Sequence, residues 1–184
     1  EDAEHISAAE RARLVASWPA HEREARARGV PMLGSGRIFM APEDSITEEP
    51  IERVPPQWFK LGAVDFGIDH PFGYVLILWD KDADVIHVHH AYRVRDALPI
   101  QHADAIKRVA SEVPTAWPVD GNVRRDDGKP MADHYKRHGV RMLPGHATWP
   151  DGSVSTEAGI LEIDEREKSG RLKYANHLTD LLQE

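Results

Sequence analysis

Two aspartates stand at the ends of apolar segments, and carboxylates in such positions suit metal-ion chemistry. Asp65 lies within the apolar run 61–68, and Asp120 closes a second run, 115–120, and is followed by a glycine. A bare carboxylate in a buried strand is costly unless a cation pairs with it. A hard divalent ion offsets that cost. The matched contexts therefore favour a shared metal site, although each acid alone also suits a turn or a helix cap.

The residues around these acids provide further candidates. Asp69 is a candidate ligand, directly or through water, and equally a turn acid before a proline. His70 is a candidate contact to a phosphate. A local excess of basic residues after Asp120 suits contacts to a nucleic-acid backbone, with a solvated face of mixed charge as the alternative. Its members are Arg124, Arg125, Lys129, Lys136, Arg137 and Arg141, and the first three are the candidate backbone contacts.

Other titratable residues have simpler explanations. His87 and His89 would share one face of a strand and could bind zinc, but a solvated sheet face is the favoured interpretation. His134 and His138 have helical spacing without the glutamate of a zinc-protease motif, so we expect them on the surface. Glu157 suits the first turn of a helix through the helix dipole, with an approach to the metal site as the alternative.

Composition excludes several classes of protein. The chain has 184 residues, with 41% hydrophobic and 29% charged residues, which is typical of one globular domain. It has no cysteine, so disulfides, thiolate zinc sites and cysteine nucleophiles are excluded. The net charge of −8 argues against binding nucleic acid by bulk attraction. The longest apolar run, 74–79, is too short to span a bilayer, and we expect no membrane association.

Hydrophobic periodicity predicts an α/β fold. A meander of three antiparallel strands is followed by alternating helices and strands, which predicts a mixed β-sheet flanked by helices. In such a sheet the first and fourth strands can be neighbours at the centre, so that Asp65 and Asp120 meet at one edge. The expected strands are 61–68, 73–79, 85–94, 115–120, 140–143 and 171–174, and the expected helices are 99–112, 130–138, 155–168 and one beginning at 177.

The first part of the chain has a different character. A helical pattern over 7–28 is interrupted by Pro19, and the Gly34-Ser35-Gly36-Arg37 turn lacks the lysine and hydroxyl residues of a phosphate-binding loop. Four prolines between 42 and 56 predict a linker, so compact folding is expected to begin near Trp58. Because the chain begins without methionine and stops within a helical pattern, we expect it to be a fragment of a larger protein.

The layout resembles that of ribonuclease H-like nucleases, and more specifically the C-terminal nuclease domain of the large terminase subunit of tailed bacteriophages. The residues that carry this resemblance are spread over nearly the whole chain. They are Gly34-Ser35-Gly36-Arg37-Ile38-Phe39, Val64-Asp65-Phe66-Gly67-Ile68-Asp69-His70-Pro71, Ala91-Tyr92-Arg93-Val94, Trp117-Pro118-Val119-Asp120-Gly121 and Asp151-Gly152-Ser153-Val154-Ser155-Thr156-Glu157-Ala158-Gly159-Ile160.

This resemblance implies a domain organisation and a chemistry. Residues 1–57 would be a tail or linker from an absent upstream packaging ATPase, and residues 58–184 a ribonuclease H-like nuclease domain truncated at its C-terminus. Asp65 and Asp120 would match two of the family's acids, and a third would lie beyond Glu184. The cofactor would be Mg²⁺ or Mn²⁺, with two ions that support hydrolysis of a phosphodiester.

The resemblance also implies a biological setting. The substrate would be concatemeric double-stranded DNA, and the partners would be the ATPase domain, the portal and the small terminase subunit. The protein would act in the host cytoplasm. Two alternatives remain: a non-catalytic module that docks on DNA or the portal, and another ribonuclease H-like enzyme of the resolvase or transposase type.

Overall fold

The computed structural model describes residues 39–67 and 70–182. The chain divides into two compact units, Glu1–Met40 and Ala41–Glu184, and the description below concerns the second unit. The helical pattern expected over 7–28 and the turn expected at 34–37 lie outside the described residues.

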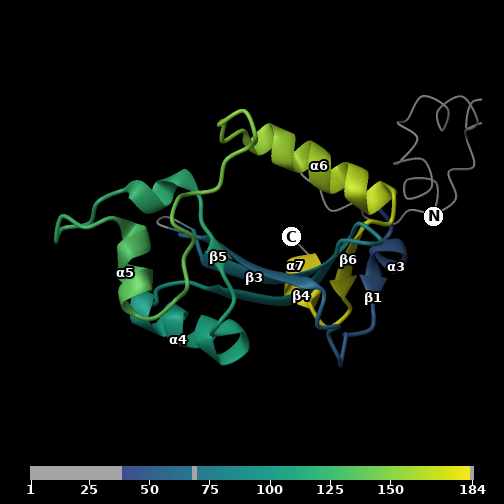
Figure 1. Ribbon diagram of the computed structural model, residues 1–184, viewed down its shortest axis with the longest axis horizontal. Coiled ribbons are helices and arrows are strands. Elements are labelled where there is room, and N and C mark those ends of the chain that lie inside the picture. Colours follow the sequence, from purple (N-terminus) through teal and green to yellow (C-terminus); the bar gives the residue numbers. More distant parts are fainter. Residues whose placement is uncertain (1–38, 68–69, 183–184) are drawn as a thin grey trace, which may run out of the picture. The chain divides into compact units, whose positions relative to one another are not determined.

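Within the described residues, six strands form one mixed sheet in the order β1-β6-β4-β3-β2-β5 (Figure 1). The antiparallel meander β2-β3-β4 is the centre of this sheet, as the alternating pattern predicted. Strand β5 runs parallel to β2, β6 runs parallel to β4, and β1 runs parallel to β6. The bounds are β1 Thr47–Glu48, β2 Phe59–Asp65, β3 Phe72–Asp80, β4 Val85–Val94, β5 Thr115–Ala116 and β6 Leu172–Ala175.

The helices form where the sequence places start and stop signals. The Ser155 hydroxyl accepts a hydrogen bond from the Ala158 amide at 3.2 Å and caps α6, and Gly139 and Gly170 end α5 and α6 with φ of 86° and 72°. No helix in the described part of the chain is both long and apolar enough to cross a lipid bilayer. The helical bounds are α3 Glu43–Ile46, α4 Pro99–Ala110, η1 Val119–Asn122, α5 Met131–Arg137, α6 Thr156–Lys168 and α7 Thr179–Leu182.

Two hydrophobic clusters cover the two faces of the sheet. Because side chains alternate along a strand, Phe72 and Tyr74 of β3 pack with α4 and α5, whereas Val75 and Ile77 pack with residues of β6, α6 and α7. Figure 1 shows α4 and α5 on one side of the sheet and α6 on the other. The sheet is therefore the central layer of an α/β domain, as the sequence predicted.

The fourth strand differs from the prediction. Residues Gly62 and Thr115 are register partners, so the first and fourth strands are neighbours as expected. However, β5 lies at the edge of the sheet and ends at Ala116, four residues before Asp120. Pro118 has no backbone N–H to continue the ladder, and the chain turns into η1 instead. The strand expected at 140–143 is reduced to a single parallel bridge between Thr115 and Met142.

The sheet also begins upstream of the boundary expected near Trp58. Strand β1 pairs with β6, and the Glu48 carboxylate lies 2.6 Å from His87 Nδ1 on β4. A strand of two residues carries no alternating pattern, so the proline spacing alone indicated a linker. The segment from Ala41 onward therefore contributes an edge strand to the domain.

Candidate functional site

Asp65 is the last residue of β2, and its side chain points into solvent. The register pairs it with Gly73 on β3, and the side chain is 65% exposed. The expectation that this carboxylate is buried within a strand was therefore wrong. The strand ends at this residue, so the carboxylate is hydrated and available to a ligand without a cost of burial.

Asp120 lies in η1, four residues beyond the end of the edge strand β5, and is also exposed. The next residue, Gly121, is buried against two aromatic rings. A Cβ on Gly121 would overlap the ring of Trp117 and would lie 2.8 Å from Cε2 of Phe66. Only glycine allows this approach. As a result, the residue after Asp120 touches the residue after Asp65.

The parallel pairing of β2 and β5 places the two acids at the same end of the sheet. Ala63 and Ala116 are register partners, and each acid lies further along its own chain segment. The carboxyl ends of neighbouring parallel strands form an edge where ligands commonly bind in α/β sheets. The contact between Phe66 and Gly121 thus joins the two backbone segments that carry the acids.

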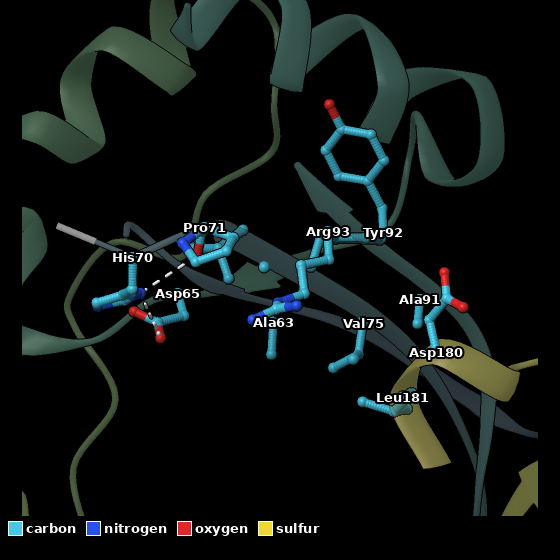
Figure 2. A pocket seen from close by; sticks show the side chains of 13 residues that line it. Ala63, Asp65, His70, Pro71, Val75, Ala91, Tyr92, Arg93, Asp180 and Leu181 are labelled. Carbon is cyan, nitrogen blue, oxygen red and sulfur yellow. Dashed lines mark hydrogen bonds and ion pairs between the residues drawn. The ribbon is translucent and has the colours of Figure 1, made fainter. Parts of the chain in front are cut away.

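A cleft of about 490 Å³ opens beside Asp65 (Figure 2). Its floor includes small side chains, those of Ala63, Val75 and Ala91, from three adjacent strands. The acidic and basic side chains that line it come from β2, β4, the loop after β2 and α7; they are those of Asp65, His70, Arg93 and Asp180. Neither Arg93 nor Asp180 was singled out from the sequence as a site residue.

His70 lies beside Asp65 in this cleft. Its Nδ1 is 3.9 Å from Asp65 Oδ2 and 3.2 Å from the carbonyl oxygen of Pro71, and the side chain is 58% exposed (Figure 2). The absence of a side chain at Gly67 allows this position of His70, because a Cβ on Gly67 would overlap the backbone of His70 and Pro71. Gly67 therefore lies directly against the backbone of His70 and Pro71. Asp69, the additional candidate ligand, lies outside the described residues.

The three basic candidates after Asp120 lie on an exposed hairpin. A bridge pairs Arg124 with Pro130, and the Arg125 amide donates to the Lys129 carbonyl at 2.9 Å. Arg124 Nη1 donates to the carbonyl of Gly128 at 2.6 Å, so this side chain braces the turn. The hairpin follows η1 directly and carries its positive charges next to the segment that holds Asp120.

Asp127 in the same hairpin is engaged by neighbouring groups. Its carboxylate accepts from the Lys129 amide at 3.0 Å and lies 3.3 Å from His134 and 3.8 Å from Arg137. The Lys129 amide is the main cause of a lowered pKa for Asp127, with smaller contributions from His134 and the nearby basic side chains. This acid therefore stays ionised and anchors the hairpin to α5. His134 is half-buried in this contact and is not a plain surface residue.

The remaining candidates lie elsewhere. His87 is 12% exposed and stacks on Trp58 with ring centroids 4.7 Å apart, so the expected solvated face was wrong. The register of β3 and β4 shifts between Leu76 and Ile77, which breaks the simple alternation that would place His87 and His89 on one face. Glu157 lies in the first turn of α6, exposed to solvent, and does not line the cleft.

The donors at this end of the sheet suit a hard divalent cation. Exposed carboxylates are the ligands that Mg²⁺ and Mn²⁺ take, and Mg²⁺ retains several waters with only one or two protein ligands. Among the described residues, no group of three or more histidine, aspartate or glutamate side chains is arranged to hold a metal ion. The exposed carboxylates of Asp65 and Asp120 therefore have the donor chemistry of such a site, which would need further ligands.

A mixed sheet of this order, with acids beyond the carboxyl ends of two adjacent parallel strands, is the arrangement that the resemblance to ribonuclease H-like nucleases leads one to expect. The family model described as the terminase RNaseH-like domain matches residues 62–184. The chain is 40% identical over its whole length to the large terminase subunit of Enterobacteria phage LP7 and spans 38% of that protein. The chain belongs to the terminase RNaseH-like domain family, which confirms the resemblance seen in the sequence.

Solved structures agree with this assignment. The nuclease domain of the P22 large terminase matches with a TM-score of 0.74 and 37% identity, over 83% of this chain and 78% of that one. The nuclease domain of the bacteriophage SPP1 large terminase, solved with bound manganese, matches with a TM-score of 0.57 and 17% identity. This second match covers 78% of both chains and shows a shared fold.

Proposed function

We propose that this chain is the endonuclease domain of a phage packaging motor and that it hydrolyses phosphodiester bonds of concatemeric double-stranded DNA. The observation that carries this proposal is the contact between Phe66 and Gly121, which joins the segments bearing Asp65 and Asp120 at one end of the sheet. The adjoining cleft offers space for a phosphate group beside Asp65. Family membership and the manganese bound in the SPP1 relative support the same proposal.

The proposed reaction needs no protein nucleophile. The oxygen of a water molecule gives up a proton and forms a bond to phosphorus, the bond from phosphorus to the leaving oxygen breaks, and the leaving oxygen takes up a proton. Two divalent ions, when bound, would supply Lewis-acid activation of the water and would stabilise the leaving oxygen. Asp65 and Asp120 would hold the Mg²⁺ or Mn²⁺ ions. Asp69 and a third acid would complete the set.

The basic and histidine side chains are assigned to the DNA backbone. His70 would contact the scissile phosphate, because it lies in the cleft beside Asp65. Arg125 and Lys129 would contact phosphates further along the duplex from the exposed hairpin. Arg124, which braces the hairpin turn, would contribute its charge from a fixed position. Such contacts position DNA without reading its sequence.

The setting of the reaction is part of the same proposal. We propose that an upstream ATPase domain of the same polypeptide moves the DNA, that the portal and the small terminase subunit are the other partners, and that cutting takes place in the host cytoplasm. The large terminase subunit of phage LP7 is much longer than this chain, which leaves room for an additional domain in a protein of that kind.

Nicking of supercoiled plasmid by the intact protein in Mg²⁺ or Mn²⁺ tests this proposal. Asp65→Asn and Asp120→Asn should each lower the rate by about 10³-fold or more, because a lost ligand displaces the ions that stabilise the transition state. Arg108→Gln, an exposed change on α4, is the matched control and should cut normally. Nicking that survives both aspartate changes would leave only the docking role. A strong preference for branched over linear DNA would instead indicate a resolvase-type enzyme.

A further inference from the structure

Asp65, Gly73 and Arg93 occupy one rung of the sheet. The register pairs Asp65 on β2 with Gly73 on β3, and Gly73 in turn with Arg93 on β4. Side chains of directly paired residues project from the same face of a sheet. The side chains of Asp65 and Arg93 therefore share one face, and the residue between them has no side chain.

The space over Gly73 is open. A Cβ built on this glycine meets only the Cβ of Asp65, at 3.9 Å, within a radius of 4 Å. The neighbouring rung consists of Ala63, Val75 and Ala91, which are also small. These residues form the floor of the cleft, and a long side chain can cross it from β4 towards β2 without displacing a neighbour.

Arg93 extends in that direction. Figure 2 shows its side chain leaving β4 towards the part of the cleft that holds Asp65 and His70, with the guanidinium over the floor near Ala63. Arg93 is an exposed residue and lines the cleft with Asp65. Arg93 is thus the only arginine or lysine among the cleft-lining residues that the structure describes.

A cation at this position suits the charge of the reacting group. The phosphodiester carries negative charge on two non-bridging oxygens, and charge shifts between its oxygens as the reaction proceeds. A guanidinium presents parallel N–H donors that match two such oxygens, whereas an ammonium group offers only a point charge. Donors that are held in place before the reaction stabilise a transition state without reorganising.

We propose that Arg93 is a catalytic residue that donates hydrogen bonds to the non-bridging oxygens of the phosphodiester held at Asp65, and that Gly73 keeps the path between them open. This inference rests on the proposed nuclease function and adds a residue to it. Arg93 is distinct from the hairpin cations, because it reaches the phosphate from β4 and lies within the cleft.

The experiment compares Arg93→Gln, Arg93→Lys and Asp65→Asn in the intact protein, with Arg108→Gln as the matched control. Plasmid nicking rates, Mn²⁺ binding by calorimetry and thermal unfolding are measured for each variant. Arg93→Gln should lower the maximal nicking rate by about 10²–10³-fold, the effect of losing one donor to the transition state. Its Mn²⁺ affinity and melting temperature should match the wild type. The nicking rate of Arg93→Lys should lie between those of the wild type and Arg93→Gln, because lysine keeps the charge and loses the paired donors.

Two results would overturn this role. Nicking by Arg93→Gln within about threefold of the wild type, against the 10²-fold loss expected for a catalytic donor, would show that the guanidinium does not touch the phosphate. A loss of Mn²⁺ binding equal to that of Asp65→Asn would show that Arg93 acts on the metal ligands instead. If Asp65→Asn itself cuts normally, the nuclease function fails, and this result is distinct from a failure of Arg93 alone.

A double-mutant cycle tests the path over Gly73. Valine at this position favours a strand and places two methyl groups between β2 and β4, so Gly73→Val should fold and lose nicking to a similar extent as Arg93→Gln. Gly73→Ala should lose less. Because both changes remove the same interaction, the double variant should cut no more slowly than Arg93→Gln. Additive losses would contradict a shared path.

Discussion

The ring of Phe66 lies where the side chain of residue 121 would begin, because Gly121 has none. An added Cβ at Gly121 would be 2.8 Å from Cε2 of Phe66 and would overlap the ring of Trp117. Phe66 follows Asp65 in the sequence, and Gly121 follows Asp120. Both aspartates are candidate metal ligands. The contact between the Phe66 ring and the backbone of Gly121 thus holds together two segments that are far apart in the sequence.

Replacing Gly121 with alanine should separate these segments. The added methyl group must displace two aromatic rings in a packed core, which costs about 1–3 kcal/mol of unfolding free energy. Nicking should fall further than this loss of stability explains, since the acids move apart. Chemical denaturation and plasmid nicking measure the two effects. Gly145→Ala is the control, because nothing lies within 4 Å of a Cβ there. An unchanged nicking rate in Gly121→Ala would contradict the role of this contact.

The hairpin after η1 should contribute to DNA binding by charge. Arg125→Gln and Lys129→Gln should each weaken binding about equally for every DNA sequence. Each change should also make the negative slope of log K against log salt less steep by about 0.9. Fluorescence anisotropy in Ca²⁺, which replaces the catalytic metal, measures this slope, with Arg108→Gln as a control. A slope that is the same in both hairpin variants and in the wild type would place the DNA elsewhere.

Acid should destabilise the domain through His102. This residue is buried, stacks on Phe72 with centroids 4.1 Å apart, and has Nδ1 3.1 Å from the Tyr92 hydroxyl. Burial lowers its pKa, so the folded state resists protonation while the unfolded chain takes up a proton near pH 6.5. The contribution of neutral His102 is therefore present above about pH 6.5 and is lost as the pH falls below it.

His102→Phe tests this assignment. The variant keeps an aromatic ring against Phe72 and removes the titrating group, so its melting temperature should decline less steeply from pH 7 to pH 5 than that of the wild type. Some decline should remain, because burial also lowers the pKa of His89 and of His90. Melting followed by circular dichroism at several pH values gives both slopes. Equal slopes would exclude His102 as a source of the acid sensitivity.

The main elements of the fold could be predicted because their signals are local. A continuous apolar run marks β3, the acidic turn after it marks the hairpin to β4, Pro99 marks the start of α4, and Ser155 with Gly170 marks the ends of α6. The short strands could not be predicted in this way. Strands β1 and β5 have two residues each and are defined by their partners in the sheet. Their existence depends on tertiary pairing that no local pattern encodes.

Part of the layout of the candidate site could also be predicted. An acid at the end of an apolar run indicated Asp65 and Asp120, and their placement at one end of the sheet follows from the pairing of β2 with β5. The exposure of Asp65 was not predicted, because a sequence pattern does not show where the strand ends. Arg93, which lines the same cleft as Asp65, was not singled out from the sequence, since its relation to Asp65 depends on the register of three strands across Gly73.

The most direct measurement of the central claim is the position of manganese in a crystal of the protein soaked in Mn²⁺, located by anomalous scattering. The proposal predicts a manganese ion within about 2–2.6 Å of carboxylate oxygens from both Asp65 and Asp120, the range for hard cations and oxygen ligands. The peak should disappear in Asp65→Asn. Manganese bound to only one of these residues, or at neither, would contradict a shared metal site and with it the proposed hydrolysis of DNA.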